Sequence, residues 1–517
     1  MKRTHDNYRI DYNENIRINK QICSAKNARE LIDIYDHNKL NFNYINISTI
    51  IHRFAKMKGD KNFIIGLIPL ITDNLRNFDS QHLANLVWAF AKLNIKNEEL
   101  FDLLTKEVSY KIKDFDPQET ANLAWSFAKL DIKNKELFEL LAKEASCKIK
   151  DFKPQEIANL AWSFATLDIK NIELFETLAI ETSYKIKDFN PQEIVNLAWS
   201  FATSNTKNIE LFDLLAKETS YKIKSFKSQD IANLSWSFAN LNITNVELFE
   251  VLVKETFHKI KKFKSQDLTN LVWAFATLNI KNIELFDLLA QETSHKIKDF
   301  KSQEIANLAW SFATLNIKNI ELFDLLAKET FYKIKDFNSQ NLTNLLWSFA
   351  VLDIKSIELF ELLISSGSKD YNSSGKFQMY QVYLHCKYEL KSDRLINLLE
   401  EIDFSTIREN IIRSSNFHLD CVLHLQLLGL EHQNEINING LYCDVYLPDK
   451  NIIIEINGPS HYTHLNNEPL GRTVFKSRLL KAMGYIVKTI PYWDWDDMDN
   501  SEEKKTYLLN LLKYYMH

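Results

Sequence analysis

The stretch SQEIANLAWSFATLNIKNIELFDLLAKETFYKIKDF, residues Ser302–Phe337, is one copy of a unit that recurs through most of this chain of 517 residues. Its tryptophan marks the period, because consecutive copies stand 37 residues apart. The repeated tryptophans are Trp88, Trp125, Trp162, Trp199, Trp236, Trp273, Trp310 and Trp347. Periods of roughly 20–50 residues are typical of stacked supersecondary units, so we expect a solenoid.

Each unit predicts two helices. Ser302 or, in other copies, a proline opens the first helix, and Asn319 precedes the second apolar run, where it is expected to cap a helix. The apolar residues at helical spacing in the first helix are Ile305, Leu308, Phe312 and Leu315. The predicted fold class is therefore mostly α, an α-solenoid of about eight 37-residue two-helix repeats. Residues 47–80 resemble one more, degenerate copy, with His52 in the place of the tryptophan.

A second face of the first helix recurs as regularly as the apolar face. At ~100° per residue, Gln303, Asn307, Trp310 and Thr314 fall opposite the apolar residues. Amide and indole groups suit bonding to base edges and stacking on bases, as in proteins that read one RNA base per repeat. We expect this Gln–Asn–Trp stripe to bind RNA through Gln118, Asn122, Trp125, Gln155, Asn159, Trp162, Gln192, Asn196, Trp199, Gln229, Asn233, Trp236, Gln266, Asn270, Trp273, Gln303, Asn307 and Trp310.

The stripe also fits a structural alternative. In that alternative the tryptophan wedges between neighbouring first helices and the asparagine bonds to the backbone at the unit boundary. Residues that are identical in every copy do not distinguish one base from another. Sequence-specific reading would therefore fall to variable positions, such as those of Glu119 and Thr166.

In seven of the eight units, the second helix ends in Lys-Ile-Lys. Stacking the units would align these lysines into basic rails along one edge, where RNA phosphates could lie. Lysine near a helix C-terminus also compensates the helix dipole, and this alternative stays open. The lysines expected to contact RNA include Lys185, Lys187, Lys222, Lys224, Lys296 and Lys298.

With these features, the unit resembles the octatricopeptide repeat, an RNA-binding helical repeat of organelle gene-expression factors. The resemblance rests on the pattern (Pro/Ser)-Gln-x-x-x-Asn-Leu-x-Trp-x-Phe-Ala and covers roughly residues 80–365. These units are one residue shorter than is usual for that family.

Composition sets further limits. The net charge of −5 argues against a uniformly basic nucleic-acid binder, so any basic surface must be local. The 5 cysteines are odd in number and far apart, which favours a reducing compartment without a disulfide framework or zinc site. No window of ~18 apolar residues occurs, so we expect no signal peptide and no membrane span. The expected compartment is the cytoplasm or an organelle, including one reached by translocation into a host cell.

The periodicity stops after Ile364, and a pattern of strands follows from residue 435. The expected elements are strands Glu435–Ile438, Leu441–Leu447 and Ile452–Asn457, a helix Arg472–Met483 and a strand Tyr485–Ile490. This order matches the restriction-endonuclease-like core. If Leu447 pairs with Ile452, Asp444 lies opposite Glu455, with Cβ atoms ~4.5–5.5 Å apart. Two facing carboxylates call for a cation or a basic neighbour.

Residues 440–498 resemble the RAP domain, which occurs at the C-terminus of organellar RNA-processing proteins, including the FAST-kinase-domain group. The resemblance rests on Asp444 to Tyr462 together with Gly471, Gly484 and the segment Ile490–Trp495. RAP domains are thought to be relatives of PD-(D/E)xK nucleases. On that analogy Asp444 and Glu455 would hold Mg²⁺ or Mn²⁺. Asn457 departs from the nuclease motif, which has Lys there, so the resemblance implies a substitute cation from Lys476 or Arg478. His461 could carry a proton, which completes the catalytic candidates Asp444, Glu455, Asn457, Lys476 and His461.

These features predict an RNA-binding protein that recognises single-stranded RNA and acts in RNA processing, maturation or stability. The alternatives are a guided, metal-dependent endoribonuclease, a RAP fold that binds without cutting, and a protein-binding scaffold. We expect a monomer whose other partners are RNA-processing proteins. The expected divisions are 1–79, an N-terminal helical cap with one degenerate repeat; 80–365, the repeats; 366–415, a helical linker; and 416–517, the RAP domain.

Overall fold

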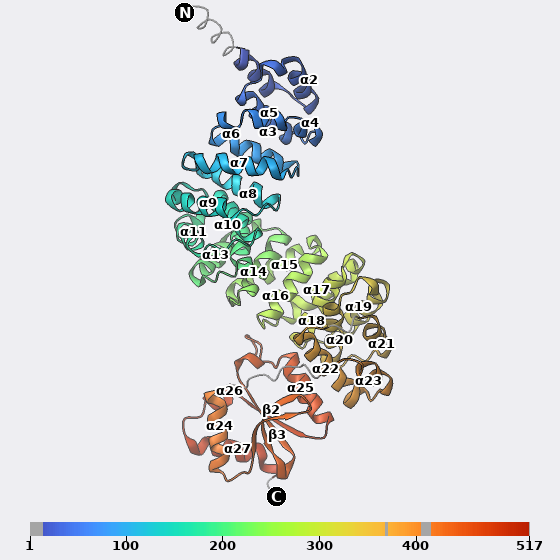
Figure 1. Cartoon of the computed structure of the whole chain (residues 1–517). Helices are drawn as coiled ribbons and strands as arrows, with labels where there is room; N and C mark the ends of the chain where they lie inside the picture. Colours follow the sequence, from blue (N-terminus) through green and yellow to red (C-terminus); the bar gives the residue numbers. More distant parts are fainter. Residues whose placement is uncertain (1–13, 368–370, 405–414, 516–517) are drawn as a thin grey trace, which may run out of the picture. The chain divides into compact units, whose positions relative to one another are not determined.

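The computed structural model describes residues 14–367, 371–404 and 415–515. They form two compact units, one reaching to Phe226 and one beginning at Lys227. The first unit holds the N-terminal helices and four repeats, and the second holds four repeats and the sheet domain. Figure 1 shows the paired helices following one another along the chain within each unit.

The chain's described part begins with a helix over residues 14–24. The next helices are α2 (Ala28–Asn38), α3 (Tyr44–Lys56), α4 (Lys61–Gly66) and α5 (Ile68–Asp73). α3 packs against the first helix of the first full repeat, and the His52 ring lies 5.1 Å from the Trp88 ring. The predicted degenerate repeat is therefore present, with its second helix broken into α4 and α5.

Each full repeat contains two helices, as the sequence predicts. The first helices are α6 (Ser80–Lys92), α8 (Pro117–Lys129), α10 (Pro154–Thr166), α12 (Pro191–Thr203), α14 (Ser228–Asn240), α16 (Ser265–Thr277), α18 (Ser302–Thr314) and α20 (Ser339–Val351). The second helices are α7 (Glu98–Lys111), α9 (Lys135–Lys148), α11 (Ile172–Lys185), α13 (Ile209–Lys222), α15 (Val246–Lys259), α17 (Ile283–Lys296), α19 (Ile320–Lys333) and α21 (Ile357–Ser366). Successive first helices pack on one another, as α16 does on α18 and α18 on α20.

The turn between the two helices uses asparagine or aspartate where many proteins use glycine. Asn279 ends α16 with φ 53°, and Ile280 N–H donates to the Phe275 carbonyl at 2.9 Å. Asn and Asp tolerate this left-handed conformation better than other non-glycine residues. The second helix is then capped, for example by Asn319, whose side chain accepts from Leu322 N–H at 2.9 Å.

The repeat core lies on the predicted apolar face. Ile305, Leu308, Phe312 and Leu315 are fully buried. The second helix of one repeat meets the first helix of the next through paired phenylalanines, as in Phe138–Phe164, whose rings meet edge to face at 4.9 Å. Such pairs stabilise beyond the burial of their area, by about 0.5–1.5 kcal/mol each.

The stack continues past the last tryptophan repeat. α22 (Ser373–His385) packs against α20, runs into a π-helical turn (Cys386–Leu390), and is followed by α23 (Asp393–Leu399). Trp347 Nε1–H donates to Gln381 Oε1 at 2.8 Å, so α22 covers the stripe of the last repeat. The predicted linker 366–415 thus contains helices, although its residues 368–370 and 405–414 lie outside the described part.

The C-terminal domain is a four-stranded sheet flanked by helices. Its strands, in sheet order, are β1 (Gln433–Ile438), β2 (Leu441–Leu447), β3 (Ile452–Asn457) and β4 (Ile486–Pro491). β1, β2 and β3 are antiparallel, and β4 runs parallel to β3. Its helices are α24 (Asn416–Leu427), α25 (Gly471–Ala482), α26 (Tyr492–Asp496) and α27 (Ser501–Leu512). The predicted order and strand bounds are confirmed to within two residues.

The helices cover opposite faces of this sheet. Ile454 and Ile456 of β3 share an apolar core with α24 and α27. Side chains alternate along a strand, so Glu455 and Asn457 face the other side, where α25 lies. Figure 1 shows α24 and α27 together on one side of β2 and β3 and α25 on the other.

The sheet domain docks on the repeats of its own unit through α25. A side chain at Gly471 would place its Cβ 1.8 Å from the Ala313 carbonyl oxygen, so only glycine allows this approach to the end of α18. Arg478 binds the Glu389 carboxylate, with Nε 2.6 Å from Oε1, and donates to the Val351 carbonyl at 2.8 Å. His464 N–H donates to the Asn279 carbonyl at 3.0 Å. This docking positions α25 at the stripe.

Candidate nucleic-acid interface

The Gln–Asn–Trp stripe has the same form in every repeat. Each glutamine is exposed and each asparagine is partly buried. The tryptophans are partly buried, except Trp347, which is only 7% exposed beneath α22. Indole surface that stays open beside an exposed amide is compatible with both earlier hypotheses, because seven of these rings are partly buried and partly exposed to solvent.

The last repeats form a groove along this stripe. A cavity of about 740 Å³ is lined by Trp273, Gln303, Asn307, Trp310 and residues of α20 and α22, including Gln378. The stripe is therefore concave here, as a surface that accommodates an extended ligand requires.

The two lysines of each Lys-Ile-Lys motif differ in role. Lys185 Nζ donates to the carbonyls of Lys150 and Phe152, at 2.6 and 2.7 Å, and pairs with Glu181 at 2.8 Å. The same pattern ties each of these lysines to the preceding repeat: Lys111, Lys148, Lys185, Lys222, Lys296 and Lys333. We call them the tether lysines.

The second lysine of each motif is exposed. This holds for Lys113, Lys150, Lys187, Lys224, Lys261, Lys298 and Lys335, which we call the rail lysines. Lys261 pairs with the buried Glu292 at 2.7 Å. Of the lysines expected to contact RNA, Lys185, Lys222 and Lys296 are bonded to the preceding repeat, whereas Lys187, Lys224 and Lys298 are exposed, and their contact with RNA stays a prediction.

The carboxylates of the sheet domain lie in the predicted register. Leu447 pairs with Ile452 and Val445 with Ile454, which sets Asp444 opposite Glu455. Asp444 Oδ2 accepts from Ile456 N–H at 2.7 Å, and its Oδ1 lies 3.9 Å from His418 Nδ1. One oxygen of Asp444 is therefore engaged by the backbone of β3.

Lys476 supplies the basic neighbour that facing carboxylates require. Its Nζ donates to Glu455 Oε2 in a short ion pair. Burial raises the pKa of Glu455, which is 5% exposed, while Lys476 opposes that shift and Asp444 adds to it. Burial alone would lower the pKa of Lys476, but Glu455 and Asp444 outweigh it and the pKa is raised. Lys476 is charged at neutral pH and holds Glu455 in place.

The other candidates lie around this pair. Asn457 is 2% exposed at the end of β3, and its Oδ1 has no hydrogen-bond partner among the described residues. His461 Nδ1 lies 3.2 Å from Thr473 Oγ1, and burial lowers the pKa of its imidazole. Arg472 donates to the Ser460 carbonyl at 2.6 Å.

These residues do not fit a divalent metal. Glu455 Oε2 is bonded to the Lys476 ammonium, and Asp444 Oδ2 is bonded to the backbone N–H of Ile456, so one oxygen of each carboxylate is already engaged. Within the described ranges, no group of three or more His, Cys, Asp or Glu side chains is arranged to hold a metal ion. The arrangement is a buried ion pair next to an open polar wall.

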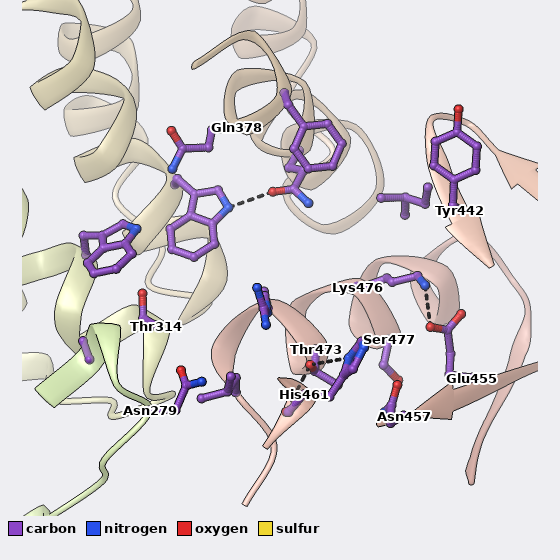
Figure 2. A pocket seen from close by; sticks show the side chains of 18 of the residues that line it. Asn279, Thr314, Gln378, Tyr442, Glu455, Asn457, His461, Thr473, Lys476 and Ser477 are labelled. Atoms are coloured by element: carbon purple, nitrogen blue, oxygen red, sulfur yellow. Dashed lines mark hydrogen bonds and ion pairs between the residues drawn. The ribbon is translucent and has the colours of Figure 1, made fainter. Parts of the chain in front are cut away.

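That wall belongs to a cavity of about 630 Å³ between the sheet domain and the repeats of the second unit. Figure 2 shows Glu455, Lys476, Asn457 and His461 on the sheet-domain side, with Thr314 and Gln378 across from them on repeat helices. Asp444 is the one catalytic candidate that does not line it.

Several lining residues were not identified from the sequence. They are Gln378, Gln381, Arg472, Thr473 and Ser477. Gln378 and Gln381 lie on α22, which packs against α20 as the next first helix would. The sequence of α22 no longer follows the repeat pattern. Arg472 adjoins the motif quoted for the RAP resemblance, and its charge four residues before Lys476, on the same helix face, was the available signal.

Comparisons with known proteins match different parts of the chain. Residues 14–246 match the family model described as RNA-editing substrate-binding complex 6 protein. Residues 251–272, 285–308 and 332–346 match a family of proteins of unknown function. Residues 454–511 match the RAP domain. A protein of Oryza sativa subsp. japonica named "RAP domain-containing protein, chloroplastic" is 31% identical over 107 residues, which is 21% of this chain and 17% of that protein.

The fold and these matches define a helical-repeat protein with a C-terminal RAP domain. The matched segment runs from β3 to α27, so it contains Glu455, Asn457, His461 and Lys476. The chain spans about one sixth of the length of the rice relative. No helix in the described parts of the chain is long and apolar enough to cross a bilayer.

Proposed function

We propose that the protein binds single-stranded RNA along the Gln–Asn–Trp stripe and acts in RNA processing, maturation or stability. The observation that carries this proposal is the recurrence, in the seven repeats from Trp88 to Trp310, of an exposed glutamine beside a partly exposed indole on one helix face. Amides bond to base edges and indoles stack on bases, and unpaired RNA exposes both.

Two further observations support RNA over a protein ligand. The rail lysines are exposed just after the second helix of seven of the eight repeats, at a spacing of one per repeat. The family model that matches the N-terminal half carries the name of a complex that binds RNA-editing substrates. A protein-binding concave face would instead present variable apolar side chains.

The test uses the full chain and fluorescein-labelled 20-nucleotide RNAs of randomised sequence, single-stranded or annealed to their complements. We expect tighter binding of the single strands, with affinity falling steeply with salt because rail lysines release counterions from phosphates. Equal binding of duplex, or no salt dependence, would contradict the proposal.

For the RAP domain, we propose binding in place of cleavage. Lys476 already neutralises Glu455, and the second carboxylate is held by the backbone of β3, so neither is poised to hold a metal. The nuclease motif has Lys at the position of Asn457, and this difference also supports binding without cleavage. Incubation of bound RNA with Mg²⁺ or Mn²⁺ should leave its length unchanged on a denaturing gel.

We also propose an organellar or cytoplasmic site of action together with other RNA-processing proteins. The rice relative is named a chloroplast protein, and the model matched by residues 14–246 is named for a complex subunit. We expect the purified chain itself to be monomeric. Light scattering on the purified chain, and recovery of crosslinked RNA with co-purifying proteins from cells, test these expectations.

A further inference from the structure

The cavity between α25 and the repeat helices is lined by side chains that carry buried oxygens without hydrogen-bond partners among the described residues. Glu455 Oε1 and Asn457 Oδ1 are buried and without hydrogen-bond partners among the described residues. Across the cavity, the hydroxyl oxygens of Thr277 and Thr314 are also buried and without hydrogen-bond partners among the described residues. An unsatisfied buried polar atom costs roughly 1–3 kcal/mol, and four of them around one cavity indicate a site built for a ligand.

We propose that this cavity receives one nucleotide of the RNA strand bound by the repeats. The inference rests on the proposed function and adds a specific site to it. The four oxygens are buried, and the side chains that carry them line the cavity. All four accept hydrogen bonds, and a nucleobase edge and a ribose hydroxyl donate them.

The walls match the other parts of a nucleotide. Trp310 and Phe377 give the repeat side aromatic surface, on which a base can stack. Arg472 and Lys476 give the opposite side two positive charges against the single carboxylate of Glu455. Arg472 and Thr473 stand in the first turn of α25, whose amide dipoles add to the attraction for a phosphate. The volume of the cavity, about 630 Å³, lies within the range of ligand pockets, roughly 300–1,000 Å³.

Continuity with the stripe identifies the nucleotide as part of a strand. The groove of about 740 Å³ along α16, α18 and α20 shares Trp310 and Gln378 with this cavity. A strand that follows the stripe toward the C-terminus therefore arrives at the cavity without leaving the protein surface. Figure 2 shows Gln378 on the repeat side, facing the residues of α25 across the cavity.

The experiment crosslinks RNA to the full chain. Single-stranded 20-mers of randomised sequence carry one 4-thiouridine at the 5′ end, the centre or the 3′ end, and crosslinked peptides are mapped by mass spectrometry. We expect one of these positions to crosslink to the peptide containing residues 471–478 or to that containing Tyr442. Crosslinks confined to α6–α20, with RNA affinity intact, would overturn the inference and leave the proposed function standing.

Variants make the test independent of crosslinking yield. Thr314→Val combined with Arg472→Gln removes an acceptor and a charge from opposite walls with little change of volume, and should lower RNA affinity about tenfold and remove the 471–478 crosslink. The matched controls are Thr177→Val, on the second helix α11 of the first unit and off the stripe, and Arg394→Gln, an exposed arginine away from the cavity. Both should keep the crosslink. Melting temperatures within ~2 °C of the wild type confirm folding.

A test with free nucleotides distinguishes the two possible occupants of the cavity, a nucleotide of a bound RNA strand and a free nucleotide. AMP, GMP, CMP and UMP at millimolar concentration are added to the full chain, and the melting temperature is followed. A rise that Arg472→Gln removes, in the absence of any RNA crosslink to the cavity, would assign the site to a free nucleotide and overturn the strand inference. Failure of the wild type to bind any RNA would instead remove the proposed function itself.

Discussion

The ammonium of Lys185 donates a hydrogen bond of 2.7 Å to the carbonyl of Phe152, which lies 33 residues earlier at the end of the preceding repeat. The Phe152 carbonyl precedes α10, the first helix of the repeat to which Lys185 belongs, so one side chain links the end of α11 to the turn that starts α10. Because the contact recurs along the array, it fixes the offset between neighbouring repeats as well as compensating the dipole of the second helix.

Replacing this tether should destabilise the fold, whereas replacing the adjacent rail lysine should not. Lys185→Met removes two hydrogen bonds and leaves Glu181, whose side chain is 9% exposed, without its counter-charge. We expect a loss of about 2–3 kcal/mol in the free energy of unfolding, measured by urea denaturation. Lys187→Met should change stability by less than ~0.5 kcal/mol and weaken RNA binding, with a shallower salt dependence. Equal destabilisation by both variants would contradict the distinction.

The tryptophans of the stripe should contribute to RNA binding directly. Trp199→Ala and Trp236→Ala, made singly in the full chain, are each expected to cost about 1–3 kcal/mol of RNA affinity by loss of one stack. Fluorescence anisotropy measures the affinity, and circular dichroism at 222 nm checks the helices. Trp347→Phe is the comparison, since that ring is buried and its nitrogen is bonded to Gln381. If helical signal falls in step with affinity, the tryptophans are core residues and the stacking role is wrong.

The repeat fold could be predicted because it follows from one regular feature of the sequence, the repeated unit. The 37-residue period set the units, and the helical phase of Ile305 and Trp310 separated the core face from the stripe. The tethers could not be predicted in the same way. Lysine at the end of a helix is explained locally by the dipole, and only the stacking geometry brings the carbonyl of Phe152 to the ammonium of Lys185.

In the sheet domain too, one feature could be predicted from the sequence and another could not. The hairpin register, and with it the opposition of Asp444 and Glu455, followed from the short loop after Leu447. The cavity depends on how α25 approaches α18, which Gly471 permits through a contact with Ala313 over 150 residues away in sequence. No local pattern encodes that approach, so the polar residues it gathers from the repeats could not be identified.

The ion pair between Lys476 and Glu455 predicts the response to metal and to substitution. Millimolar Mg²⁺ or Mn²⁺ should leave the melting temperature of the full chain unchanged, because Lys476 already neutralises the carboxylate. Glu455→Gln should destabilise by about 1–3 kcal/mol, since it leaves the Lys476 ammonium largely buried without its partner. The double variant Glu455→Gln with Lys476→Met should recover most of that loss. A metal-dependent rise in melting temperature that Glu455→Gln removes would restore the metal site.

The N-terminal degenerate repeat should make stability depend on pH through His52. Burial, aided by Lys56 and Arg53, lowers the pKa of His52 to about 4, below the usual 6.5. The unfolded chain therefore binds a proton that the folded chain does not, and stability present above pH ~6.5 is lost as the pH falls toward 4. We expect this residue to account for about 2–3 kcal/mol, measured by urea denaturation of the full chain between pH 7 and 4. His52→Phe, which keeps an aromatic ring against Trp88, should remove that part of the decline, whereas the exposed His295→Phe should not. Identical pH profiles for wild type and His52→Phe would show that the imidazole is not the group responsible.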